Sequence, residues 1–338
     1  MFIQQNISLK HRNTFGIDAY AKEFVEISKV EELVVLVGSF NLTERKFLVI
    51  GGGSNILITK DFDGMVIKNT IKGIEKIKED TDFVWVKSMA GEVWHEFVLY
   101  CIGNGYAGLE NLSLIPGYVG AAPMQNIGAY GAEIKDTFDA LEALEIESGE
   151  IISFTNEQCK FGYRESIFKN EAKGKYIIVS VTFKLSKNPK LNISYGAIQQ
   201  MLEKNGVSNP SIKDVSDAVI AIRKSKLPDP LILGNAGSFF KNPEISEAQF
   251  LKLKSQFPQI VGYPVASGNI KLAAGWLIEQ CGWKGKQVGN TGAHKDQALV
   301  LVNYGGATGN EIWSLAMDIQ KSVQEKFGVT INPEVNIV

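Results

Sequence analysis

The chain has 338 residues, and its 35 lysines and arginines nearly balance its 37 aspartates and glutamates, for a formal net charge of −2. This length predicts two or three domains, and the near-neutral charge gives no reason to expect a nucleic acid or an anionic membrane surface as a partner. No stretch approaches the roughly 18 apolar residues of a membrane span, and the first residues show no apolar signal core. These features predict a cytoplasmic protein without a membrane partner.

The cysteines are three in number and lie far apart, at Cys101, Cys159 and Cys281. An odd number of widely spaced cysteines argues against a disulfide framework, and a zinc site would need paired ligands. The histidines are equally scattered, so no metal site is predicted.

Short strands with a few helices are expected in the first two thirds of the chain. A helix is predicted over 28–38, with Ser28 and Glu31 as a capping box and Gly38 at its end. Another amphipathic helix ends at Gly103, and a hairpin turns at Ser148-Gly149. Strands are predicted at residues 46–50, 65–69, 74–78, 83–91 and 176–186, and helices at residues 195–206 and 216–226.

The prolines of LPDP, residues 227–230, stop the last of these helices, and a change of composition there places the main domain boundary near residue 227. Beyond it, Thr308 and Glu311 form a second predicted capping box at the start of a long amphipathic helix. Helices are predicted at residues 246–257, 271–282 and 308–328, and strands at residues 298–303 and 329–338. The fold class is therefore α+β.

Two glycine-rich stretches compete for a nucleotide cofactor. Residues 103–108, GNGYAG, match the dinucleotide pattern G-x-G-x-x-G, but a helix precedes them and no long helix follows. Because that pattern must leave a strand and open a helix, this stretch is interpreted as a helix stop. Residues 51–55, GGGSN, do follow a strand, and their backbone N–H groups could approach a phosphate. On this segment alone, a plain hairpin turn is an equal alternative.

A third stretch favours the cofactor. Residues 113–133, SLIPGYVGAAPMQNIGAYGAE, form a long segment that is rich in glycine and alanine and nearly uncharged. Long loops of this kind are usually functional or disordered, and the apolar content argues against disorder. Small residues with a few amide side chains suit a large flat ring with polar edges, which describes a flavin.

These segments together closely resemble the family of UDP-N-acetylenolpyruvoylglucosamine reductases, the MurB family. The resemblance spans nearly the whole chain, and its motifs occur in the family order: NTFGI, GGGSNILI, the 113–133 segment, FGYRESIFK, SKLPDP, GNAGSFFKNP, AGWLIEQCG and PEV. It implies a two-part FAD-binding region of the vanillyl-alcohol-oxidase (PCMH) type over residues 1–226, with its core at about 17–187. A separate α+β substrate-binding domain would cover 227–338, with its final strand returning to the active site.

The resemblance also implies the activity: a UDP-N-acetylmuramate dehydrogenase that uses FAD and NADPH to reduce UDP-N-acetylglucosamine enolpyruvate to UDP-N-acetylmuramate in peptidoglycan biosynthesis. The two glycine-rich loops contain neither cysteine nor histidine, so FAD is expected to bind non-covalently. The SYGAI segment resembles the longer of the family's two types, and the chain is expected to act as a monomer.

Three residues are predicted to be catalytic. In the implied reaction, a hydride adds to the enolpyruvyl double bond and a proton then reaches the neighbouring carbon. Arg164 is expected to grip the substrate carboxylate with its planar fork, and Glu334 to stabilise the enol. An apolar context favours the protonated form of a glutamate, which can then donate a hydrogen bond. Ser238, flanked by Ala236-Gly237, is predicted to give the proton; without the family motif, a turn or helix cap is its more common role.

The resemblance assigns further residues to binding. The residues expected to hold FAD are Gly51, Gly52, Gly53, Ser54, Asn55, Pro116, Gly117, Gly120, Ala121, Gln125, Asn126 and Gly128. The residues expected to contact the UDP-sugar substrate are Tyr195, Lys226, Asn242, Tyr263 and Lys271. One departure concerns Asn336, which stands where related sequences often carry arginine, so substrate contacts near it are less certain.

Two alternatives are kept. A flavin oxidase or dehydrogenase of the same fold would act on another small substrate, but it has no need to assemble Ser238 with Arg164 and Glu334. A non-catalytic nucleotide-sugar or flavin-binding protein would be expected to lack one of these residues, and all three are present.

Overall fold

The computed structural model describes residues 1–265 and 267–338. The chain divides into two compact units. Unit 1 comprises Met1–Ile7, Ala21–Gly52 and Asp63–Ser225, and unit 2 comprises Ser8–Tyr20, Gly53–Phe62 and Lys226–Val338. The FAD-binding region was predicted over residues 1–226 without interruption, whereas two early segments of that range pack with the C-terminal residues in unit 2. The chain therefore passes between the units several times.

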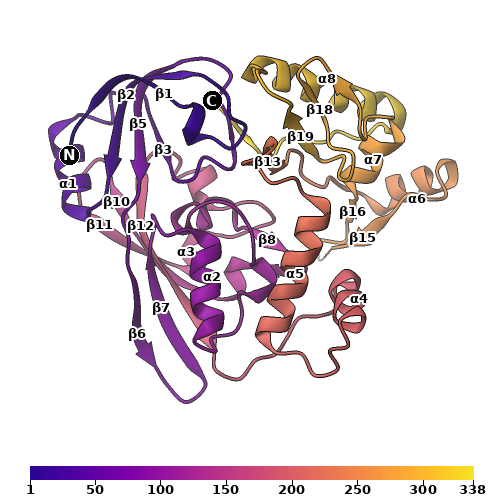
Figure 1. Ribbon diagram of the computed structural model, residues 1–338, viewed down its shortest axis with the longest axis horizontal. Helices are drawn as coiled ribbons and strands as arrows, with labels where there is room; N and C mark the ends of the chain where they lie inside the picture. The colour runs from indigo at the N-terminus through magenta and orange to yellow at the C-terminus, as the bar shows by residue number, and fades with distance from the viewer. Residues whose placement is uncertain (266) are drawn as a thin grey trace. The chain divides into compact units, whose positions relative to one another are not determined.

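The first part of unit 1 is a four-stranded sheet with a helix. Its strand order is β1 (Gln4–Ser8), β2 (Tyr20–Ile27), β5 (Phe62–Asn69) and β3 (Phe47–Ile50), shown in Figure 1. The pair β3 and β5 is parallel. Helix α1 (Val30–Ser39) buries Leu33 and Leu36 against this sheet, in a core that also receives Leu144 and Ile177 from the second sheet. Burial of these side chains holds the two parts of unit 1 together.

The second part of unit 1 is a five-stranded antiparallel sheet. Its order is β11 (Ile151–Thr155), β10 (Phe138–Glu145), β12 (Tyr176–Ser186), β7 (Phe83–Met89) and β6 (Ile74–Glu79). Helix α2 (Trp94–Gly103) packs Trp94 and Phe97 on this sheet beside Phe183 of the central strand β12. Seven of the eleven residues of β12 lie in one buried run, as expected for a strand covered on both faces.

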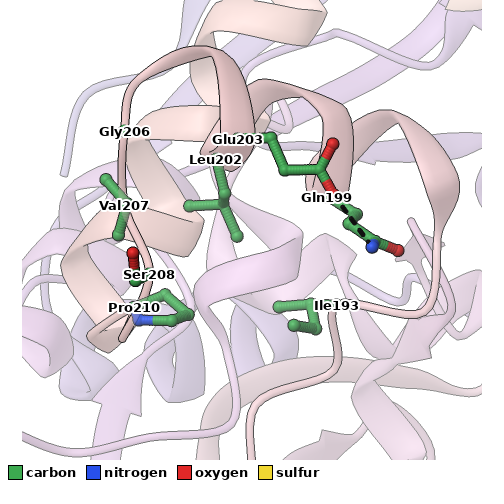
Figure 2. A pocket seen from close by; sticks show the side chains of 8 residues that line it. All are labelled: Ile193, Gln199, Leu202, Glu203, Gly206, Val207, Ser208 and Pro210. Atoms are coloured by element: carbon green, nitrogen blue, oxygen red, sulfur yellow. Dashed lines mark hydrogen bonds between the residues drawn. The ribbon is translucent and has the colours of Figure 1, made fainter.

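The rest of unit 1 consists of short elements and two helices. The short elements are β8 (Gly128–Ala129), β9 (Ala132–Glu133), α3 (Asn156–Cys159) and the 3₁₀ turns η2 (Glu110–Leu112), η3 (Val119–Ala121), η4 (Pro123–Gln125), η5 (Ile134–Asp136) and η6 (Ile167–Lys169). Helices α4 (Gly196–Lys204) and α5 (Ile212–Lys226) share a small core of their own, which includes Ile198, Leu202 and Val219. A pocket of about 420 Å³ lies beside α4, and Ile193 and Leu202 are among the residues that line it. Figure 2 shows these lining side chains.

Unit 2 contains three small sheets. The first has the order β13 (Gly234–Ser238), β19 (Val300–Asn303), β18 (Thr291–Ala293) and β17 (Gln287–Val288). The second has the order β14 (Glu244–Ile245), β16 (Ile270–Leu272) and β15 (Gly262–Pro264), and the third pairs β20 (Asn336–Ile337) with β4 (Ile56–Leu57) in parallel. The other elements of the unit are η1 (Lys10–Arg12), α6 (Glu247–Gln256), α7 (Ala274–Gln280) and α8 (Gly309–Phe327).

Helix α8 shows why an early segment belongs to unit 2. It begins at Gly309, where an added Cβ would lie 1.9 Å from the carbonyl oxygen of Ile58. Only a residue without a side chain fits so close to the neighbouring backbone. The apolar face predicted for this helix is buried, and the predicted capping box of Thr308 and Glu311 is confirmed.

Four local predictions need correction. The N-terminus of α1 is held by Glu32, whose carboxylate accepts from the backbone of Ser28 and Lys29, instead of by Glu31. Helix α5 begins at Ile212, four residues before the predicted start. Lys271 lies in β16 and not at the start of α7. The strand predicted over 329–338 is reduced to β20, because only these residues pair with β4.

The predicted helix stop at residues 103–108 is confirmed. Helix α2 ends at Gly103, and Gly105 and Gly108 have positive φ angles of 76° and 127°. Among the described residues, no helix is both long and apolar enough to cross a membrane.

Candidate active site

The first two glycines of the GGGSN stretch meet the 113–133 segment within unit 1. A Cβ added at Gly51 would lie 2.9 Å from Cβ of Tyr118, and one added at Gly52 would lie 3.4 Å from Cα of Gly117. The turn after β3 therefore runs directly against the 113–133 segment, and side chains at these two positions would separate them. The strands on either side of this turn, β3 and β4, belong to different sheets, so the turn is not a hairpin.

Backbone hydrogen bonds fix the middle of this loop to the start of α2. Trp94 N donates to Gly117 O at 3.0 Å, Val119 N to Glu92 O at 2.9 Å, and Gly120 N to Ala90 O at 2.9 Å. A Cβ at Gly120 would lie 2.5 Å from Cβ of Ala90, so glycine is required there. The loop is thus an ordered part of unit 1.

Asn126 differs from the other residues expected to contact FAD. Its side chain is fully buried, and its amide donates to Glu133 Oε2 at 3.0 Å and to Gly162 O at 2.9 Å. Its Oδ1 accepts from Lys135 N at 3.1 Å. These three hydrogen bonds commit the Asn126 side chain to stabilising the loop. The backbone of Asn126 lies in the left-handed region, with φ of 45°. By contrast, Pro116 and Ala121 are exposed at the surface of the loop.

Arg164 lies beside the far end of this loop. Its Nη2 donates to Gly128 O at 2.7 Å, which places the guanidinium next to one of the residues expected to bind FAD. Its backbone has φ of 55°, in a tight turn where Gly162 and Glu165 exchange two hydrogen bonds. A non-glycine residue in this region is strained, and such strain is concentrated at functional sites.

Arg223 on α5 is a candidate that the sequence analysis missed. Its Nε donates to Leu114 O at 3.2 Å. Burial lowers the pKa of Arg223, and a hydrogen-bonded contact with Tyr130 partly opposes this shift, while the charge of Arg164 adds to it. Two arginines therefore lie close enough to interact at one edge of the loop. The sequence did carry a signal: Arg223 lies seven residues after Ser216, on the buried face of an amphipathic helix.

Tyr195 also lies near this edge. It precedes α4, and its ring packs edge-on against Tyr130, with centroids 5.2 Å apart and planes at 87°. The side chain of Asn192 ties this segment to the loop by donating to Gly131 O at 2.9 Å. Tyr195 is 48% exposed, so its ring remains accessible for contact with a ligand.

In unit 2, Ser238 ends strand β13. The register of β13 on β19 shifts between Asn235 and Ser238, which marks a bulge before the serine. Gly237 supplies the positive φ, 70°, and its N–H is held by Asn235 Oδ1 at 2.9 Å. At the start of the strand, a Cβ on Gly234 would lie 2.4 Å from Phe15 O, so this glycine too is required by a close backbone.

Glu334 lies beside this strand end. Its N–H donates to Phe239 O at 2.7 Å, and Phe239 directly follows Ser238. The carbonyl of Glu334 accepts from the side chain of Asn55 at 3.4 Å, and Asn336 N donates to Asn55 O at 3.0 Å. Unit 2 therefore brings together two predicted catalytic residues and the last residue of the GGGSN stretch.

The residues of unit 2 expected to bind substrate form a second group. Tyr263 and Lys271 are paired across β15 and β16, and Lys271 Nζ lies 3.6 Å from Glu244 Oε1. Asn242 Oδ1 accepts from Ala274 N at 3.0 Å, at the start of α7. Lys226 is exposed at the end of α5. The pairing of Tyr263 with Lys271 places an aromatic ring beside a cation on one small sheet.

The described residues contain no group of three or more histidine, cysteine, aspartate or glutamate side chains that could hold a metal ion. The cysteines are free, and burial raises the pKa of Cys159 to about 12, so that it carries no thiolate at neutral pH.

Comparisons with known proteins identify the class. A family model described as "FAD binding domain" matches residues 21–155, and one described as "UDP-N-acetylenolpyruvoylglucosamine reductase, C-terminal domain" matches residues 229–338. A solved reductase of that name from Thermus caldophilus superposes with a TM-score of 0.67 over 99% of both chains, at 24% identity, which shows the shared fold. The chain is thus an oxidoreductase with an FAD-binding domain, and the expected α+β flavoprotein fold is confirmed.

Full-length relatives identify the family. The chain is 57% identical to the UDP-N-acetylenolpyruvoylglucosamine reductase of Flavobacterium johnsoniae over all of both chains. It is 53% identical to that of Amoebophilus asiaticus, again over all of both chains, and 48% identical to that of Pseudomonas aeruginosa over 99% of this chain and 98% of the relative. The chain belongs to the UDP-N-acetylenolpyruvoylglucosamine reductase family. The roles given to individual residues stay predictions.

Proposed function

We propose that this protein reduces UDP-N-acetylglucosamine enolpyruvate to UDP-N-acetylmuramate in the cytoplasm, with non-covalently bound FAD and with NADPH as the reductant. Family membership supports the reaction class. The choice of NADPH, the cytoplasmic location and the monomeric state are parts of the same proposal and rest on the resemblance described above.

The residues of unit 1 fit a bound flavin. Gly51, Gly52 and Gly117 let two backbone segments run against each other without intervening side chains, and the exposed part of the 113–133 loop is uncharged. Bound FAD would supply hydride transfer between the reductant and the substrate. This chain's own part is to hold the ring through backbone groups of the loop and to place Arg164 beside Gly128.

The observation that carries the proposal is the hydrogen bond from Glu334 N to Phe239 O, at 2.7 Å. It brings the backbone of Glu334 next to the residue that directly follows Ser238, at a strand end shaped by Gly234 and Gly237. In the proposed reaction, Ser238 gives a proton to the carbon next to the one that received hydride, and Glu334 stabilises the enol by a hydrogen bond. A hydroxyl is a weak acid, but an enolate carbon is basic enough to accept its proton.

The remaining predicted residues would hold the substrate. Arg164 would bind the enolpyruvyl carboxylate through its planar fork. The UDP part needs cations for its diphosphate and a flat partner for its base, which suits Lys226, Lys271, Tyr195 and Tyr263.

A flavin spectrum and a product analysis test the proposal. We expect the purified protein to be yellow, to release intact FAD on heating, and to bleach when NADPH is added. Addition of the enolpyruvyl UDP-sugar should restore the oxidised spectrum, and mass spectrometry should find UDP-N-acetylmuramate. Colourless protein that takes up no added FAD would contradict the cofactor. Bleaching by NADPH with no reoxidation by this substrate would favour an oxidase or dehydrogenase of another small molecule.

A further inference from the structure

Leu114, at the start of the predicted flavin loop, has an unusual backbone. Its φ angle is 58°, in the left-handed region that leucine rarely adopts. Such a conformation is strained for a residue with a Cβ and persists only where neighbouring groups enforce it. The next residues, Ile115, Pro116 and Gly117, lead directly into the part of the loop that runs against the GGGSN turn.

Both backbone groups of Leu114 are held by side chains from helices. Its N–H donates to Nδ1 of His95 on α2 at 3.0 Å, and its carbonyl accepts from Nε of Arg223 on α5 at 3.2 Å. The preceding residue is held as well, because the hydroxyls of Ser113 and Ser216 lie 2.7 Å apart in the core. Three side-chain contacts thus fix two consecutive residues.

Of these contacts, the one from His95 depends on a protonation state. Nδ1 can accept a hydrogen bond only when it carries no proton, so the imidazole must be neutral with its proton on Nε2. The charged groups that face His95 are Glu96 on its own helix and Arg223 and Lys224 on α5. Burial, followed by these two cations, lowers the pKa of His95, and Glu96 opposes the shift only weakly.

We propose that His95 is a positioning residue for FAD: its neutral imidazole holds the Leu114 peptide in the conformation from which the 115–120 segment enters the flavin loop. This inference rests on the proposed function, since it takes that loop to bind FAD. His95 touches neither cofactor nor substrate in this role and acts through the backbone of Leu114.

Three variants test the role of His95. His95→Ala removes the acceptor and should weaken FAD binding by about three- to tenfold, the range expected for one lost hydrogen bond. His95→Asn keeps an acceptor oxygen near the position of Nδ1 and should bind FAD within about twofold of the parent protein. The control is His294→Ala, which removes a similar bond from Asp296 N to an imidazole Nδ1, 3.3 Å long, in unit 2, and should leave FAD affinity unchanged. Flavin fluorescence at pH 7.5 gives each dissociation constant.

Rescue by glycine separates positioning from packing. Glycine adopts positive φ without strain, so Leu114→Gly should make FAD affinity much less sensitive to loss of His95. In a double-mutant cycle, His95→Ala should cost less than twofold in the Leu114→Gly background. An equal cost in both backgrounds would overturn the proposal, as would FAD binding by His95→Ala within twofold of the parent, or an equal loss in His95→Ala and His95→Asn.

The pH dependence of the hydrogen bond between Leu114 and His95 provides a second test. Because the pKa of His95 is lowered in the folded protein, its contribution is complete above the ordinary value of about 6.5 and is lost as the pH falls below that value. The protection factor of the Leu114 amide against hydrogen exchange, measured on FAD-free protein and corrected for the intrinsic pH dependence of exchange, should fall over the same range in the parent but not in His95→Asn. Protection that does not change with pH would contradict the role of His95, whereas failure of every protein to take up FAD would contradict the proposed function itself.

Discussion

The predicted flavin loop of unit 1 and the Ser238 strand end of unit 2 differ in which residues adopt the left-handed backbone conformation. The loop, residues 113–133, carries three non-glycine residues with positive φ, namely Leu114, Asn126 and Tyr130. Backbone hydrogen bonds to the start of α2 and side-chain hydrogen bonds both hold it, and Asn126 makes three of the latter. In the strand end, residues 234–240, only Gly237 has a positive φ. Backbone pairing with β19, the close approach of Gly234 to Phe15 and three hydrogen bonds of the Asn235 side chain hold this segment.

This difference indicates how each region tolerates change. A loop that is fixed by specific side chains loses its shape when one of those side chains is removed. A strand end that is fixed by close backbones is disturbed when a side chain is added. Chemistry is expected to follow the same division: unit 1 holds a large ring through its backbone, and unit 2 presents single side chains, Ser238 and Glu334, on a rigid support.

The largest expected effect comes from Ser238→Ala. Loss of a general acid commonly slows a reaction by about 10²–10⁴-fold. We expect this slowing only in reoxidation of the flavin by the enolpyruvyl substrate, while bleaching by NADPH keeps its normal rate. Ser238→Cys should recover part of the loss, because a thiol also donates a proton. Stopped-flow absorbance measures the two half-reactions separately, and equal slowing of both would indicate a structural role for this strand end.

Arg164→Lys should have the next largest effect. The change keeps the positive charge but loses the planar fork, and removal of a group that stabilises developing charge typically costs about 10²–10³-fold in rate. Reoxidation by substrate should slow by this order, with flavin reduction by NADPH preserved. Lys173→Arg, at an exposed lysine of the same stretch of chain, serves as the control. A rate within threefold of the parent would remove Arg164 from the chemistry.

Paired glycine substitutions test the comparison between the regions directly. Gly120→Ala in the loop and Gly234→Ala in the strand should each lower the free energy of unfolding by about 1–3 kcal/mol, because each added methyl meets a fixed neighbour. Only Gly120→Ala should also reduce the FAD content of the purified protein. Gly103→Ala is the matched control, since no atom lies within 4 Å of its added Cβ. Thermal unfolding and flavin absorbance supply the two readouts, and reversed FAD losses would show that the strand end supports the cofactor.

The smallest effect is expected at Tyr195. Contact of its ring with the flat base of the UDP-sugar would be of a kind worth about 0.5–1.5 kcal/mol, so Tyr195→Ala should raise the KM for the UDP-sugar by about two- to tenfold. Tyr195→Phe keeps the ring and should raise it less. NADPH oxidation with an artificial acceptor should be unchanged in both variants. A slower flavin reduction by NADPH would instead place this residue at the cofactor.

Local structure followed from local pattern at most positions. The helix from Thr308 was predictable because its capping box and its apolar stripe lie within a few turns of each other. The wrong prediction of Glu31 as the capping residue also concerns only neighbouring residues. Two adjacent glutamates can both reach the helix N-terminus, and the geometry of the turn selects Glu32. The small residues of the 113–133 segment are also informative by themselves, because glycine and alanine allow a neighbouring backbone to approach closely, while their role in binding a flavin stays a prediction.

Only the tertiary structure shows which distant residues contact one another. Asn126 was expected at the cofactor, but only the folded loop shows its amide committed to Glu133, Gly162 and Lys135. Composition and periodicity by themselves do not pair Glu334 with Phe239, since that hydrogen bond joins residues far apart in the chain, and the predicted return of the last strand came from family resemblance. Composition and periodicity also do not predict the packing of Gly309 on Ile58. Nor do they predict the hydrogen bonds of His95 and Arg223 with the backbone of Leu114. Periodicity and composition act over a few residues, whereas hydrogen bonds between distant segments form only once the core has brought those segments together.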